Sequence, residues 1–159
     1  MPEIDITLLG RFAVKVDGVA VADNHWKRRH AAPLVKVLAL APGRRLHREQ
    51  IIDLVWPDDT IDEAVPKLHK AAHYARRALD VPCSVVLRGE TVVLCPDADT
   101  SVDVMSFEEA ARRALADQDV VAATGALTLY GGELLPQDRY DGWAEERREI
   151  GRASCRERV

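Results

Sequence analysis

DEAVPKLHKAAHYARRAL, residues 62–79, has the pattern of a single amphipathic helix with one apolar and one cationic face. At about 100° per residue, an apolar stripe suited to a protein core is formed by Val65, Leu68, Ala72, Ala75 and Leu79. The opposite face carries Lys70, His73 and Arg77, and its flanks carry Lys67, His69 and Tyr74. No acidic residue follows Glu63 in this stretch, whereas solvated helices usually mix both signs because i,i+4 ion pairs stabilise them. The cationic face therefore predicts a polyanionic partner such as DNA.

The start of this helix is harder to place, because Pro66 lies close to it. Thr60 or Asp62 can cap the N-terminus, and Glu63 lies near its positive end. Proline in a helix interior removes a hydrogen bond, so we expect Pro66 in the first turn. The regular helix is therefore predicted to run from about Pro66 to Leu79.

Strands and two helices are predicted before this helix. Residues 3–22 alternate between apolar and polar, and Asp17-Gly18 within them is a strong hairpin signal. Residues 28–41 are rich in Ala, Leu and Val and predict a helix that ends at Pro42-Gly43. A second short helix is expected from His47 or Arg48 to Val55.

A second hairpin is predicted after the cationic helix. SVVLR, residues 84–88, and TVVLC, residues 91–95, flank Gly89-Glu90. Glycine at the first turn position favours a two-residue type II′ turn. A sheet, three helices and a terminal hairpin, in this order, are the layout of a winged helix with an N-terminal antiparallel sheet.

An all-helical module is predicted after a linker at residues 96–101. FEEAARRALAD and DVVAATGALTLY are two amphipathic helices separated by a few residues, so we expect antiparallel neighbours. GGELLPQDRYDG predicts a loop, and WAEERRE begins another helix. The fold class is therefore α+β: a winged helix followed by an all-α, TPR-like helical module.

The ending EIGRASCRERV, residues 149–159, matches the in-frame translation of a common sequencing adapter. We therefore expect residues 150–159 to be a non-native tail and the natural chain to continue differently. A short natural polar tail is the alternative.

The composition, 47% hydrophobic and 30% charged, is typical of a soluble globular protein. No apolar run approaches the roughly 20 residues that cross a bilayer, and the N-terminus carries acids where a signal peptide carries bases. We therefore expect a cytoplasmic protein without membrane contact. The net charge of −4 is unevenly distributed, since residues 1–95 hold 14 Lys and Arg against 12 Asp and Glu, and the remainder 8 against 14. This asymmetry predicts two modules with different partners.

No arrangement of residues predicts catalysis, a cofactor or a metal. His69 and His73 have the spacing of an HExxH zinc motif, but Lys70 replaces its glutamate and no third ligand is near. Cys83 and Cys95 flank the second hairpin. They could form a disulfide or redox switch, although free thiols are the default in a reducing compartment. Residues 131–132, Gly-Gly, lack the GK[ST] of a phosphate loop.

Several stretches in order along residues 4–149 resemble one family. They are LLGRFAV, VDGVAV, LVKVLALAPGRRLHREQIIDLVWPDD, HKAAHYARRALD, VDVMSFEEAARRA and ALTLYGGELLPQDRYDGWAEERRE. With them the chain resembles SARP/AfsR-type bacterial transcriptional activators. This family joins an OmpR-like winged helix to a bacterial transcriptional activation domain of TPR-like helices. The resemblance implies a DNA-binding domain at residues 1–96 and a partial activation domain at residues 101–149.

The resemblance also implies the roles of individual elements. The helix of residues 66–79 is expected in the major groove, the wing of residues 84–95 near phosphate or the minor groove, and Trp56 in the core. The implied DNA contacts, with Arg76 alternatively lying over the core, are Lys67, Lys70, His73, Arg76, Arg77, Arg88, Lys27, Arg28 and Arg29. The implied partners are double-stranded DNA, a second copy on direct repeats and RNA polymerase.

Some features differ from this family and favour a second hypothesis. The wing lacks an aromatic residue, and Glu90 at its tip is unfavourable to phosphate. Ala71 and Ala72 stand where many relatives have longer polar side chains, and Pro66 lies in the helix. The alternative is a winged helix that does not bind DNA and serves as an interaction or autoinhibitory module of a larger signalling ATPase.

Overall fold

The computed structural model describes residues 2–26, 30–81, 83–118 and 120–129. The predicted loop and helix after residue 130 and the expected non-native tail lie outside this range. So do Lys27, Arg28 and Arg29. The chain divides into two compact units, one of Met1–Ile4 with Val14–Thr100 and the other of Asp5–Ala13 with Ser101–Val159.

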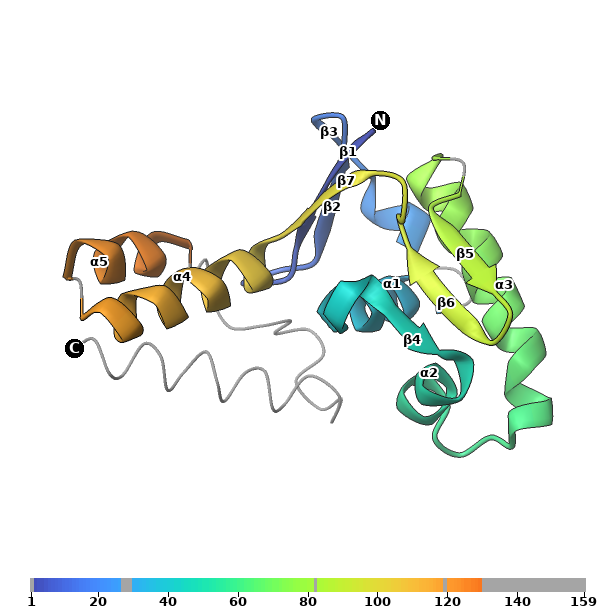
Figure 1. Ribbon diagram of the computed structural model, residues 1–159. Coiled ribbons are helices and arrows are strands. Elements are labelled where there is room, and N and C mark those ends of the chain that lie inside the picture. Colours follow the sequence, from blue (N-terminus) through green and yellow to red (C-terminus); the bar gives the residue numbers. More distant parts are fainter. Residues whose placement is uncertain (1, 27–29, 82, 119, 130–159) are drawn as a thin grey trace. The chain divides into compact units, whose positions relative to one another are not determined.

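The fold is α+β, as the sequence predicts, with five α-helices and two small sheets in the described residues (Figure 1). The strand order is β3-β2-β1-β7 in one sheet and β4-β6-β5 in the other. In chain order the elements are β1 (Glu3–Thr7), β2 (Ala13–Val16), β3 (Val19–Ala20), the 3₁₀ helix η1 (Asp23–Trp26), α1 (Ala31–Leu40), the 3₁₀ turn η2 (Pro42–Arg44), β4 (Arg45–His47), α2 (Arg48–Val55), α3 (Ile61–Leu79), β5 (Val85–Arg88), β6 (Thr91–Leu94), β7 (Asp99–Val102), α4 (Asp103–Asp117) and α5 (Val120–Leu129).

Both predicted hairpins are confirmed. Asp17 and Gly18 have positive φ of 51° and 81°, as a type I′ turn requires, and Val16 pairs with Val19. In the second hairpin Arg88 pairs with Thr91 across Gly89-Glu90. Only the glycine of this turn has a positive φ, 63°, which agrees with the predicted type II′ turn.

The core of the first unit lies between the three helices and the β4-β6-β5 sheet. Leu34 and Leu38 of α1, Ile51 of α2 and Leu68 of α3 are at most 1% exposed. Burying one such side chain stabilises the fold by roughly 1.5–3 kcal/mol. α3 packs on α1, α2 and β5, so the wing hairpin lies against the helix (Figure 1). The core therefore fixes which face of α3 is left outside.

The start of α3 was predicted wrongly. The helix begins at Ile61, and Pro66 is its sixth residue. A capping box holds the first turn: the Glu63 amide donates to Thr60 Oγ1 over 3.3 Å, and the Thr60 amide to the Glu63 carboxylate over 3.2 Å. Pro66 removes one donor, the one that would reach the Asp62 carbonyl, and both residues are exposed, so water can replace it. The cap therefore outweighs the proline.

Two other boundaries also differ from the prediction. α1 begins at Ala31 rather than at residue 28, since His30 has a left-handed φ of 61° that ends any helix there. The predicted linker at residues 96–101 contains most of strand β7, which neighbours β1. The strand sequence DTSV is short and mostly polar, so its periodicity is too weak to recognise.

The second unit is centred on α4, which packs against α5. Val104, Phe107, Ala111 and Ala114 form the buried face of α4. Asp103 ties residues 5–13 into this unit, because its carboxylate accepts the Leu8 and Leu9 amides over 2.8 and 3.0 Å. Helices α4 and α5 confirm the two predicted helices, although α4 begins at Asp103, four residues before the predicted FEEAARRALAD.

Candidate nucleic-acid interface

The outer face of α3 carries the cationic row that its periodicity predicts. Lys70, His73 and Arg77 are exposed, as are Lys67 and His69. Lys70 and Arg77 form no hydrogen bond or ion pair within the described residues. These two cations are therefore available to an external anion.

Two other cations of α3 are engaged within the protein. Lys67 Nζ lies 2.5 Å from Asp59 Oδ2 in an ion pair. Arg76 is half-buried and donates from Nη1 to the Val85 carbonyl over 2.8 Å. Arg76 therefore links α3 to β5, which is the core-side alternative considered for it from the sequence. Both residues have a structural role that competes with an external phosphate.

Ala71 and Ala72 do not belong to the outer face. Both side chains are fully buried against the core. Their small size is explained by close packing of α3, since core positions are sensitive to single methylene groups. They therefore say nothing about how well the exposed face reads DNA.

The wing tip is bound to the start of α2. Glu90 accepts from His47 Nε2 over 3.0 Å and from Arg48 Nη2 over 3.4 Å, and the Arg48 amide donates to the Glu90 carbonyl over 2.7 Å. The His47 hydrogen bond, followed by the charge of Arg48, lowers the pKa of Glu90 below its usual value. The acid at the tip is thus matched by two basic residues, while neighbouring Arg88 is exposed.

His47 also caps α2 through its second ring nitrogen. Its Nδ1 accepts the Glu49 amide over 3.1 Å, which leaves Nε2 to donate to Glu90. A neutral imidazole with its proton on Nε2 satisfies both bonds. Sequence reasoning did not assign His47 and Arg48 to the interface, although the basic run RRLHR contains them; their partner Glu90 is more than 40 positions away.

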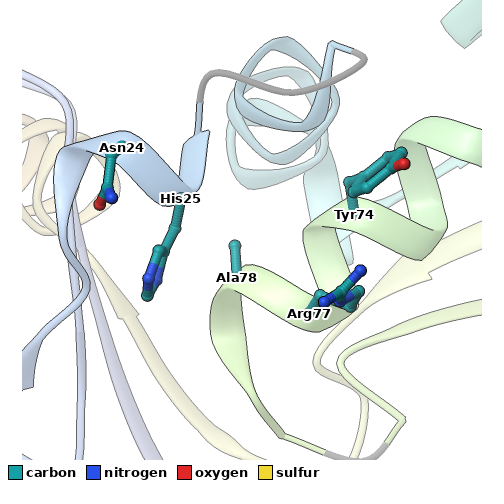
Figure 2. Close-up of a pocket in the computed structure, with 5 residues that line it drawn as sticks. All are labelled: Asn24, His25, Tyr74, Arg77 and Ala78. Atoms are coloured by element: carbon teal, nitrogen blue, oxygen red, sulfur yellow. The ribbon is translucent and has the colours of Figure 1, made fainter.

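An open pocket of about 380 Å³ lies beside the cationic row. Figure 2 shows Asn24 and His25 on η1, on one side of the pocket, and Tyr74, Arg77 and Ala78 on α3, on the other. Asn24 and His25 were not singled out from the sequence, because no periodic pattern marks so short a helix. Arg77 thus belongs both to the outer row of α3 and to this pocket.

Neither cysteine near the wing forms a disulfide. Cys83 is exposed and free, while Cys95 is buried and free. Burial raises the pKa of the Cys95 thiol to about 11. A thiol this hard to ionise is a poor nucleophile, so the structure gives no support to a redox switch.

The described part of the chain holds neither a metal-binding cluster nor a membrane-spanning helix. No group of three His, Cys, Asp or Glu residues there is arranged to hold a metal ion, so His69 and His73 have no third ligand. No helix in the same ranges is both long and apolar enough to cross a bilayer.

Comparison with known proteins gives a structural likeness but no sequence match. Neither the protein-family models nor the curated proteins contain a match to the chain. Among solved structures, it is similar to Mycobacterium tuberculosis EmbR in complex with a low-affinity phosphopeptide, with a TM-score of 0.72 and 16% identity. The likeness covers 98% of this chain and 43% of the EmbR chain. It shows a shared fold, and this chain spans less than half of that protein.

Proposed function

We propose that the chain is a DNA-binding transcriptional regulator, or part of one, in which α3 enters the major groove. The observation that carries this proposal is the exposed face of α3, where Lys70, His73 and Arg77 lie on a helix that has no acidic residue after Glu63. The winged-helix fold presents this face outward, and the likeness to EmbR supports a SARP-like fold.

The geometry of the row suits a groove. Lys70 and Arg77 are seven residues apart, which corresponds to about 10 Å along a helix axis. This distance matches about three base-pair steps of roughly 3.4 Å each, in a groove about 12 Å wide. Arginine can contact a guanine edge through two hydrogen bonds, and lysine can contact either a guanine or a phosphate. Arg88 on the wing would add a phosphate contact.

Three of the four features that favoured a winged helix without DNA binding have a structural explanation. Pro66 is accommodated in a capped helix, Ala71 and Ala72 are buried, and Glu90 is paired with His47 and Arg48. The fourth feature, the absence of an aromatic residue from the wing, still favours the alternative. An interaction module within a larger signalling ATPase is therefore the second candidate, kept because the chain covers 43% of the EmbR chain.

The helical unit is proposed to contact protein rather than DNA. α5 exposes Val120 and Val121, which are 78% and 81% accessible. Adjacent apolar side chains on a surface support a protein contact. A second copy of the chain and RNA polymerase are the partners proposed for it.

The test is a fluorescence-anisotropy titration against duplex DNA from upstream of the gene, at two salt concentrations. Lys70→Ala and Arg77→Ala are each expected to weaken binding by about 1–3 kcal/mol where a base is read. Where a phosphate is contacted, each lost contact lowers the salt slope by about 0.9. Arg112→Ala, an exposed arginine of α4, is the matched control and should leave binding unchanged. If the double variant binds like the wild type, the interaction-module candidate replaces this proposal.

A further inference from the structure

Four of the five residues that line the pocket between η1 and α3 have polar side chains. Asn24 and His25 form one wall, and Tyr74 and Arg77 form the other, with the small Ala78 beside them (Figure 2). η1 is anchored by Trp26, which is 8% exposed. Tyr74, Arg77 and Ala78 are spaced i, i+3 and i+4, so one side of α3 supplies their wall. The two walls therefore come from two anchored elements of the same unit.

The lining has the donor set of an anion site. A guanidinium, an imidazole and a carboxamide line the pocket from its two walls, and no carboxylate of the described residues is among the lining side chains (Figure 2). The side chains of Asn24, His25 and Arg77 form no hydrogen bond with any other described residue, so these donors are open to a ligand. The acids nearest in sequence are Asp23 and Asp80, which lie outside the lining.

The size of the pocket and the chemistry of arginine narrow the ligand class. At about 380 Å³ the pocket falls in the range of roughly 300–1,000 Å³ that small-molecule sites occupy. The planar guanidinium of arginine binds phosphate through two parallel hydrogen bonds, which lysine cannot do. The imidazole of His25 and the carboxamide of Asn24 add N–H donors.

We propose that this pocket binds a phosphate group. Arg77 would donate hydrogen bonds to two of its oxygens, and His25 and Asn24 would donate hydrogen bonds from the opposite wall. The phosphate belongs either to the DNA backbone beside the groove or to a small phosphorylated molecule. The DNA source rests on the proposed function, whereas the small-molecule source does not. Because Arg77 is shared with the outer row of α3, a small phosphorylated ligand would also compete with DNA for it.

The experiment uses the full chain with two ligand arms. In the first, AMP is titrated by calorimetry, with adenosine as the matched ligand that lacks the phosphate. In the second, duplex DNA is titrated by anisotropy at two salt concentrations. His25→Ala and Asn24→Ala are the pocket variants, and Lys70→Ala is the control outside the pocket. Both pocket residues are exposed, so the variants should fold, which far-UV circular dichroism checks.

Two outcomes support the proposal and identify the source of the phosphate. A small-molecule site gives binding of AMP but not adenosine, weakened about tenfold or more by His25→Ala and unaffected by Lys70→Ala. A backbone site gives no AMP binding, but His25→Ala weakens DNA binding about tenfold through the lost hydrogen bond, while the salt slope stays unchanged because that slope counts phosphates neutralised by Lys and Arg. The proposal is overturned if adenosine binds as well as AMP, or if neither pocket variant alters either arm. If Lys70→Ala leaves DNA binding unchanged while AMP still binds to the pocket, only the proposed function is refuted.

Discussion

Replacing Pro66 with alanine should stabilise the protein, because Pro66 interrupts a helix that the capping box starts five residues earlier. Alanine restores the N–H that Pro66 lacks, and with it the bond to the Asp62 carbonyl. Proline in a helix interior costs about 3 kcal/mol relative to alanine. Two effects reduce the gain: water already serves the exposed carbonyl, and proline restricts the unfolded chain by about 0.4–1 kcal/mol. A net gain of about 1–2 kcal/mol is therefore expected.

The assay is urea denaturation followed by tryptophan fluorescence, to which Trp26 and Trp56, both buried in the first unit, contribute. A gain of this size should also raise the melting temperature by about 2–8 °C. Thr60→Ala should have the opposite effect and lower the free energy of unfolding by about 1 kcal/mol, since it removes the cap. Pro57→Ala is the matched control, because Pro57 is exposed in a turn and its replacement only loosens the unfolded chain.

The two possible starts of α3 predict changes of opposite sign in the free energy of unfolding on Pro66→Ala. If the helix began at Pro66, proline would occupy its favoured first position and lose no bond. Pro66→Ala would then destabilise the protein as slightly as Pro57→Ala does, and Thr60→Ala would have no effect. That pair of results would refute the continuous helix from Ile61 to Leu79.

Three further outcomes are expected. Asp103→Ala should lower the free energy of unfolding by about 1–3 kcal/mol, because two buried backbone amides lose their acceptor, and thermal melts of the variant measure this. The pKa of Glu90 is lowered in the folded protein, so its contact with His47 stabilises the fold above pH 4.5, the usual pKa, and this stabilisation is lost as the pH falls through the folded-state pKa. Glu90→Gln should therefore flatten the pH dependence of the urea midpoint in that range. Cys83 should react with a thiol reagent at pH 8 in the native protein, whereas Cys95, with its pKa of about 11, should react only after unfolding; equal rates would contradict its burial.

The features that could be predicted from the sequence are those set by local pattern. The apolar stripe of α3 and the two turns at Asp17-Gly18 and Gly89-Glu90 are each determined within a few residues. Both turns are confirmed, and so are four of the five stripe residues, all but the half-buried Val65. Pro66 was misplaced because two local rules conflict there. Intrinsic propensity opposes a helix through proline, and the capping box of Thr60 and Glu63 favours one, but the sequence does not say which is stronger.

The charges of the candidate site could be predicted only in part, because pairing depends on distant residues. Lys67 and Asp59 are eight positions apart, and a carboxylate so near in sequence was a usable signal. Glu90 and its partners at the start of α2 are 42 and 43 positions apart, so no local pattern identifies them.

This pairing changes which cations can serve an external anion. From the sequence, α3 offers four Lys and Arg side chains on or near one face, and Glu90 opposes them from the wing tip. In the structure two of the four are engaged with Asp59 and the Val85 carbonyl, and Glu90 is matched by basic neighbours. Lys70 and Arg77 remain as the strong donors of the helix. If α3 enters the groove as proposed, two long side chains about three base-pair steps apart could read few base pairs, so sequence selectivity would have to come from a second copy bound alongside.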